Sequence, residues 1–183
     1  MRALLLAAAF AAVATPALAE FKLASTDVKA GSPMAAAQVF NGFGCTGQNI
    51  SPALSWSGEP AGTQSFAVTM FDPDAPTGSG WWHWTVFNIP ASAHSLPAGA
   101  GSDASKDLPA GAVQGKNDFG FSFYGGPCPP AGDHAHHYEI TVYALKVPKL
   151  ELDESASGAK VGFNLHANAL ATANIVGRYG RAK

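Results

Sequence analysis

The pattern of apolar and polar positions predicts three β-strands in the middle and later parts of the chain. Residues 65–71 form a nearly continuous apolar run that ends at an Asp-Pro pair. Residues 82–89 are rich in aromatic and β-branched side chains and stop at a proline, which is typical of a strand end. Residues 138–145 alternate, so that Tyr138 and Ile140 face the same side. The pattern therefore predicts a sheet-based fold.

One amphipathic helix is predicted near the C-terminal end, over residues 161–173. Four apolar side chains there fall on one face: Phe163, Leu165, Ala169 and Leu170. Residues 175–179 are expected to add a last short strand or to pack as a tail. Long Gly-, Pro- and Ser-rich loops separate the strands, and such loops are often functional; they cover residues 41–52, 91–115 and 125–132.

The composition fits one predominantly β domain over residues 20–183, with no internal repeat and no linker. An apolar fraction of 47% in 183 residues excludes a disordered chain, which could not bury enough surface to offset its entropy. Only 11 Lys and Arg and a net charge of −2 leave no basic face for a phosphate backbone, so nucleic-acid binding is not expected.

Residues 1–19 have the order of a secretory signal peptide. Arg2 precedes an apolar run, and Ala17-Leu18-Ala19 is a small-residue cleavage pattern. The alternative is a membrane anchor, but the run is well short of the roughly 20 residues that span a bilayer. We expect cleavage after Ala19, a periplasmic or secreted product, and no transmembrane segment in the remaining chain.

The two cysteines, Cys45 and Cys128, have two interpretations. In an oxidising compartment they favour a disulfide, and the alternative is a pair of buried free thiols. No CxxC pattern occurs, so a redox-active role is not predicted.

Polar side chains concentrate on two segments that each combine a proline turn with a strand. The first holds Asp72 and Asp74 before Trp82-His83-Trp84, and the second holds His136 and Tyr138. Strand alternation puts His136 and Tyr138 on one face and His137 on the other. The same rule puts Trp82 and Trp84 on one face and His83 opposite. A shared pocket of His83, His136 and Tyr138 with Asp72 above it is therefore geometrically feasible.

Such a pocket suits a small anion, because imidazole and phenol groups donate hydrogen bonds to an oxyanion. A nearby carboxylate is expected to raise an imidazole pKa, so that anion affinity falls as pH rises through the histidine range. Asp72 also repels a full dianion, so a phosphate ester that carries an ammonium group would suit both halves.

Three other interpretations of these residues stay open. Asp72 and Asp74 are common turn residues. His134, His136 and His137 look like a metal-binding tract, but they lack the HExxH pattern, so no metal ligand and no cofactor is predicted. An Asp–His pair can also act as general acid and base in a hydrolase, although no Gly-x-Ser-x-Gly motif occurs and no catalytic residue is assigned.

Five motifs in order resemble the phosphatidylethanolamine-binding protein (PEBP) family, in particular its bacterial, Raf-kinase-inhibitor-like branch. The resemblance covers about residues 21–179, and the motifs are Cys45–Trp56, Asp72–Pro76, Trp82-His83-Trp84, Asn117–Gly120 and Gly125–Tyr138. It implies a large central antiparallel sheet, a smaller sheet and short peripheral helices.

The resemblance also implies a small anion pocket. The residues that match the family's pocket are Asp72, Asp74, His83, His136 and Tyr138. Pro127 and Pro129 match the loop that forms the rim of the pocket. The family's usual Arg before the tyrosine is His137 here, so an ion pair made by that Arg is not carried over to this chain. The kinase-inhibitor role of animal members does not transfer to an exported protein.

Two functions follow from different classes. The first is a protein that binds a phosphate ester or phospholipid head group without chemistry, and the second is a hydrolase of esters or phosphoesters. We favour the binding protein. A further hypothesis is that the outer loops modulate another protein, and the sequence identifies no such protein partner.

Overall fold

A five-stranded antiparallel sheet organises the molecule. In the computed structural model, which describes residues 20–104 and 106–183, the strand order is β10-β9-β5-β6-β8. The strands are β5 (Ser65–Asp72), β6 (Trp81–Pro90), β8 (Val113–Gln114), β9 (His136–Leu145) and β10 (Ala169–Tyr179). The predominantly β fold and the three central strands predicted from the sequence are confirmed.

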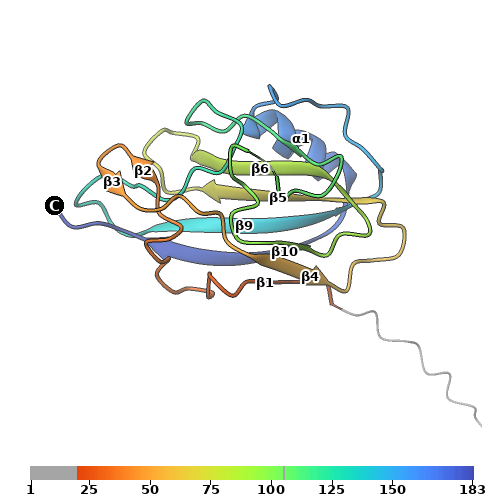
Figure 1. Ribbon diagram of the computed structural model, residues 1–183, viewed down its shortest axis with the longest axis horizontal. Coiled ribbons are helices and arrows are strands. Elements are labelled where there is room, and N and C mark those ends of the chain that lie inside the picture. The colour runs from red at the N-terminus through yellow and green to blue at the C-terminus, as the bar shows by residue number, and fades with distance from the viewer. Residues whose placement is uncertain (1–19, 105) are drawn as a thin grey trace, which may run out of the picture.

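Strands β5 and β6 of the central sheet are buried on both faces. A three-stranded sheet of β1 (Lys22–Ala24), β4 (Leu54–Ser57) and β7 (Ser95–Leu96) lies on one side and helix α1 (Gly158–Asn168) on the other, as Figure 1 shows. Phe66 and Val68 of β5 pack toward the small sheet, whereas Ala67 packs toward the helix. Burial on both faces explains why the sequences of β5 and β6 are nearly continuous apolar runs.

The helix is shorter than the sequence predicted, and the prediction for residues 169–173 is wrong. Helix α1 begins after the N-cap Ser157, whose hydroxyl accepts from the Lys160 amide, and ends at Asn168. Residues 169–179 instead form strand β10, which pairs with β9 along its whole length. The ladder to β9 outweighs the helix propensity of the alanines.

The predicted buried face of the helix is also partly wrong. Leu165 is buried, but Phe163 is 77% exposed, and Leu170, now in β10, is 43% exposed. The helix packs through Val161, Leu165 and two glycines, and any side chain at Gly158 would collide with the ring of Trp82.

Short elements occupy the predicted loops. Strands β2 (Asn41–Gly42) and β3 (Cys45–Thr46) form a hairpin within 41–52, and β7 and β8 lie within 91–115. The hairpin turn is Phe43-Gly44, and both residues have positive φ, 51° and 80°. This is the backbone of a tight two-residue hairpin turn, which asparagine and glycine usually occupy.

The described residues hold no helix with the length and apolar character needed to span a bilayer. The predicted signal peptide, residues 1–19, lies outside the described part of the chain.

Candidate functional site

Three strand ends meet at one edge of the central sheet. Strand β5 ends at Asp72, and its neighbours β6 and β9 begin there, because both run antiparallel to β5. Asp72 pairs with Trp81 in the ladder, and Phe71 pairs with Glu139. The antiparallel topology therefore brings the two polar segments of the sequence together.

A β-bulge sets the direction of His83. Met70 pairs with Trp84, and the next residue of β5, Phe71, pairs with Trp82. His83 is therefore the extra residue of β6 and has no partner on β5 in the ladder. Trp84 consequently packs in the core on the small-sheet side, whereas Trp82 contacts the glycines of α1. The prediction that the two tryptophans share a face is wrong, because a bulge interrupts strict alternation.

A cavity of about 180 Å³ opens at this edge. It is smaller than the roughly 300–1,000 Å³ of drug-sized pockets, so it suits a group of a few heavy atoms. Its walls combine aromatic and apolar side chains with a few polar groups: Phe43, Asp72, Pro76, Thr77, Trp81, His83, Phe119, Cys128 and Tyr138.

The structure divides the sequence-predicted pocket residues into two groups. Asp72, His83 and Tyr138 line the cavity. His136 lies behind Asp72 and does not line it, and the other three predicted residues are also absent from its walls: Asp74, Pro127 and Pro129. The proline loop reaches the cavity through Cys128 instead.

A buried chain of polar groups supports Asp72, which is 2% exposed. One carboxylate oxygen accepts from the Asp74 amide at 2.9 Å, and the other contacts His136 Nδ1 at 2.8 Å. The second nitrogen of His136 lies 3.3 Å from an Asp133 carboxylate oxygen. Burial favours the neutral ring, but the hydrogen bonds to Asp72 and Asp133 outweigh it and raise the pKa of His136.

His83 has the opposite electrostatic character. Its Nδ1 donates to the Gly125 carbonyl at 2.7 Å, and its Nε2 lies 4.0 Å from Asp72 Oδ2. Complete burial lowers its pKa to about 4, despite the Gly125 carbonyl and the Asp72 charge. The ring is therefore neutral near pH 7 and turns an Nε2 lone pair toward Asp72. The expectation that a carboxylate would raise this imidazole pKa is wrong, because desolvation dominates.

Two donors in the cavity wall have no partner. Among the described residues, five buried side-chain polar atoms make no hydrogen bond, and two of these belong to wall residues: Trp81 Nε1 and the Tyr138 hydroxyl. Tyr138 also holds His83 by an edge-to-face contact with ring centroids 5.1 Å apart. Because a buried donor without a partner is costly, a ligand oxygen that reached either atom would remove that cost.

Asp74 and His137 form a separate network beside the site. His137 Nδ1 donates to Asp74 Oδ2 at 2.6 Å, and its Nε2 accepts from Arg178 at 2.7 Å. The hydrogen bond from His137 contributes to lowering the pKa of Asp74, against the effect of burial. His137 points away from the cavity, as strand alternation predicted, and links Asp74 to β10.

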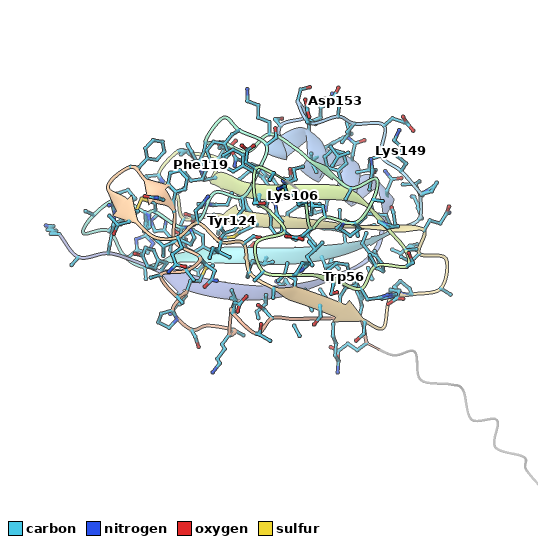
Figure 2. The ribbon with its side chains drawn as sticks, in the orientation of Figure 1. Trp56, Lys106, Phe119, Tyr124, Lys149 and Asp153 are labelled. Carbon is cyan, nitrogen blue, oxygen red and sulfur yellow. A yellow bond between two sulfur atoms is a disulfide. The ribbon has the colours of Figure 1, made fainter. Side chains whose placement is uncertain are left out.

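An aromatic lip, formed by Phe43 and Phe119, was not predicted from the sequence. The two rings lie 5.7 Å apart, and Phe119 also contacts Trp81 and His83 edge-on at 5.3 Å. Figure 2 shows Phe119 beside the β2–β3 hairpin. Phe43 is 70% exposed and has left-handed backbone, which is unfavourable for a bulky residue. The sequence signals available were a phenylalanine between two glycines, for Phe43, and the family motif Asn117–Gly120, for Phe119.

Side-chain amide groups fasten the loops around the cavity. Asn117 donates to the carbonyls of His83 and Phe123, and Asn49 accepts from the Gly126 amide at 2.8 Å. Gly126 must be glycine because a β-carbon there would collide with the Gln38 carbonyl.

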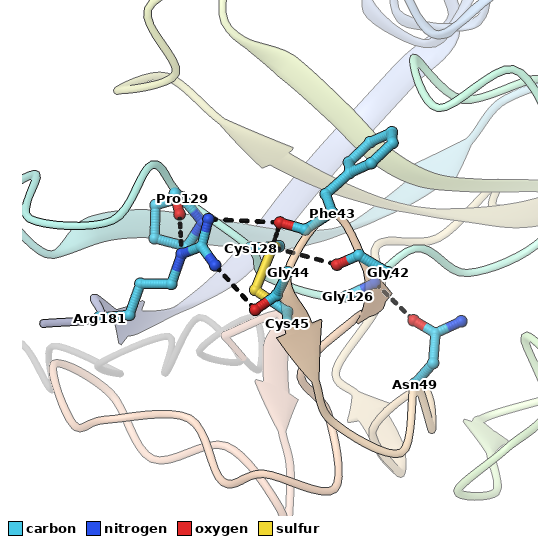
Figure 3. Close-up of a disulfide and its surroundings, with 9 residues drawn as sticks. All are labelled: Gly42, Phe43, Gly44, Cys45, Asn49, Gly126, Cys128, Pro129 and Arg181. Atoms are coloured by element: carbon cyan, nitrogen blue, oxygen red, sulfur yellow. Dashed lines mark hydrogen bonds between the residues drawn. A yellow bond between two sulfur atoms is a disulfide. The ribbon is translucent and has the colours of Figure 1, made fainter. Parts of the chain in front are cut away.

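The disulfide predicted as one of two alternatives is present. Cys45 and Cys128 are bonded with their Cα atoms 6.0 Å apart, which joins the β2–β3 hairpin to the proline loop (Figure 3). Arg181 reinforces the junction by donating to the carbonyls of Pro129 and Gly44. The hairpin that carries Phe43 is therefore anchored covalently to Cys128 in the cavity wall.

Comparisons with known proteins identify the family of the chain. The family model described as phosphatidylethanolamine-binding protein matches residues 24–180. UPF0098 protein YbcL of Escherichia coli K12 is 56% identical over 161 residues, which is 88% of each chain. UPF0098 protein YbhB of the same organism is 50% identical over 158 residues, covering 86% of this chain and 99% of that protein.

Solved structures give the same assignment. The crystal structure of Escherichia coli YbcL, described as a new member of the mammalian PEBP family, has a TM-score of 0.87 over 88% of this chain and 99% of its own. A putative PEBP homologue from Chlamydia trachomatis, CT736, is 28% identical with a TM-score of 0.73, covering 90% of this chain and 99% of that one. The chain therefore belongs to the phosphatidylethanolamine-binding protein family.

Proposed function

We propose that the cavity at the β5, β6 and β9 edge binds a phosphate ester or a phospholipid head group without converting it. The observation that carries the proposal is the pair of unpartnered donors in the wall, Trp81 Nε1 and the Tyr138 hydroxyl. An oxyanion satisfies both donors, and the aromatic lip excludes water and strengthens these few polar contacts.

The acceptors of the site select the charge state of the ligand. Asp72 presents carboxyl oxygens, and neutral His83 presents a lone pair at Nε2, 4.0 Å from Asp72 Oδ2. A group that carries a proton, such as a P–OH or an ammonium, donates to either acceptor. A full dianion would face the carboxylate without such a donor. The ligand is therefore a singly charged phosphoryl group or an ester with an attached ammonium.

The wall favours binding over hydrolysis. Of its described residues, Thr77 carries an aliphatic hydroxyl and Cys128 a sulfur, two of the groups that serve as covalent nucleophiles in enzymes. The Thr77 hydroxyl donates to the Gly80 carbonyl at 2.5 Å, and Cys128 is in the disulfide. Both groups are engaged, so the Asp–His pair has no activated partner among them.

The proposed place of action is outside the cytoplasm, in the periplasm or in the secreted fraction. The charged, apolar and small-residue order of residues 1–19 supports export, and a disulfide persists in oxidising compartments. A relative from Mycobacterium tuberculosis, 39% identical over 75% of this chain, is named a putative lipoprotein, which is consistent with a surface or envelope location.

Calorimetric titration tests the proposal with three probes. Phosphorylethanolamine carries both a phosphoryl group and an ammonium, ethanolamine lacks the phosphoryl group, and sulfate is a dianion that does not take up a proton near pH 6. We expect phosphorylethanolamine to bind, and ethanolamine and sulfate to bind at least about tenfold more weakly, the loss of one charge-assisted hydrogen bond. Equal binding of sulfate, or no binding of phosphorylethanolamine at millimolar concentration, would refute the proposal.

A further inference from the structure

A second cluster of polar side chains lies on the outer side of His136. Asp133, His134 and His136 each place a ligand-type atom within 4.8 Å of the other two. Asp133 Oδ2 is 3.3 Å from His136 Nε2, and Asp133 Oδ1 is 2.9 Å from His134 Nδ1. The two imidazole rings lie with their centroids 5.2 Å apart. The cluster therefore gathers two nitrogens and a carboxylate at one point.

The buried member of the cluster is already oriented for coordination. His136 is fully buried, and its Nδ1 contacts the buried Asp72 carboxylate at 2.8 Å. A histidine that binds a metal through one nitrogen almost always donates its other N–H to a carboxylate or carbonyl, which fixes the ring and makes it a better ligand. Asp72 supplies that second contact independently of Asp133 and His134.

The separation between His136 and Asp133 fits a small tetrahedral ion. Two ligands about 2.0–2.1 Å from Zn²⁺ at the tetrahedral angle lie roughly 3.3 Å apart, which is the separation of His136 Nε2 and Asp133 Oδ2. Asp133 keeps a partly exposed side chain, 32% of its surface, and it lines an open hollow of about 470 Å³. Water can reach the cluster there and complete the coordination.

We propose that Asp133, His134 and His136 form a binding site for a divalent transition metal ion of the Zn²⁺ class. Two imidazoles and one carboxylate match the ligands that zinc takes, whereas Mg²⁺ and Ca²⁺ prefer oxygen ligands alone. The ion would take the place of the hydrogen bond between His136 and Asp133 and leave the His136–Asp72 contact intact. The site therefore adjoins the cavity through Asp72 without occupying it.

The test is titration of the full purified chain, freed of metal, with Zn²⁺ against a chelating indicator. The variants are His134→Ala and Asp133→Asn, both at exposed or partly exposed positions, and the matched control is His166→Ala, an exposed histidine on α1. We expect one ion per chain, a loss of affinity of at least about tenfold in both variants, and none in the control. Excess Mg²⁺ should not displace the ion.

NMR of the histidine side-chain nitrogens separates this site from accidental surface binding. Zn²⁺ should shift the His136 Nε2 resonance while Nδ1 keeps its proton toward Asp72. Absence of binding, equal affinity in His134→Ala and wild type, or binding that leaves the His136 nitrogens unshifted would each overturn the proposal. These outcomes do not depend on whether an anion binds in the cavity, so the metal site and the anion site are tested independently.

Discussion

Replacing Tyr138 by phenylalanine should separate stability from binding. The Tyr138 hydroxyl is buried and has no hydrogen-bond partner among the described residues, and an unsatisfied buried polar group costs about 1–3 kcal/mol. Removing it should leave the fold at least as stable, with a gain of about 1 kcal/mol. For a chain of 183 residues, that gain corresponds to a rise in Tm of roughly 2–4 °C.

The same variant should lose ligand affinity. A hydrogen bond to a charged group contributes about 1.5–3 kcal/mol, so Kd for phosphorylethanolamine should rise roughly 10- to 150-fold. Differential scanning calorimetry measures the first effect, and isothermal titration calorimetry measures the second on the same sample.

Tyr124→Phe is the matched control. Tyr124 is also fully buried, but its hydroxyl donates to the Gln38 carbonyl at 2.9 Å, and it does not line the cavity. This variant should lose about 1 kcal/mol of stability and keep its ligand affinity. If Tyr138→Phe is destabilised as much as Tyr124→Phe, or if it binds the ligand as well as wild type, the reasoning about the unpartnered donor is wrong.

Three further predictions concern pH and the disulfide. Because the pKa of His83 falls from 6.5 to about 4 on folding, the unfolded chain binds the proton first, so its contribution to stability is present above pH 6.5 and is lost toward pH 4. Between pH 6.5 and pH 4, the free energy of unfolding of wild type, measured by urea titration, should fall by about 3 kcal/mol more than that of His83→Gln. If the two proteins lose stability in parallel over this range, the lowered pKa of His83 is wrong. Affinity for a phosphomonoester should fall about tenfold per pH unit above its second pKa of about 6, whereas a phosphodiester should show no such fall; calorimetry at pH 6, 7 and 8 distinguishes them. Cys45→Ala with Cys128→Ala opens a link between residues 83 apart in sequence, and thermal unfolding should show a loss of about 4 kcal/mol; an unchanged Tm would count against the link.

The sequence was sufficient for the strands that carry the site. Apolar runs and proline stops located β5, β6 and β9, since period and composition are local properties. The Asp72 turn and the Tyr138 strand could be placed for the same reason, and antiparallel pairing then brings their ends together. The family resemblance added the expectation of a pocket at this edge.

The rest depended on pairing that local patterns do not encode. The bulge that turns His83 toward Asp72 exists only in the register between β5 and β6. Strand β10 replaces the end of the predicted helix because β9 offers it a full ladder. Phe43 and Phe119 come from distant loops. The hairpin and the disulfide hold Phe43 at the cavity, whereas the Asn117 side chain fastens the loop of Phe119. The pKa of His83 depends on burial, which the sequence does not give.

The central claim is that the cavity holds a phosphoryl group between the donors and the acceptors of its wall. A crystal structure with bound phosphorylethanolamine tests it most directly. We expect a phosphoryl oxygen within hydrogen-bond distance of the Tyr138 hydroxyl or Trp81 Nε1, and the ammonium or P–OH beside Asp72 and His83 Nε2. An empty cavity at saturating ligand, or a ligand seated elsewhere, would contradict the account.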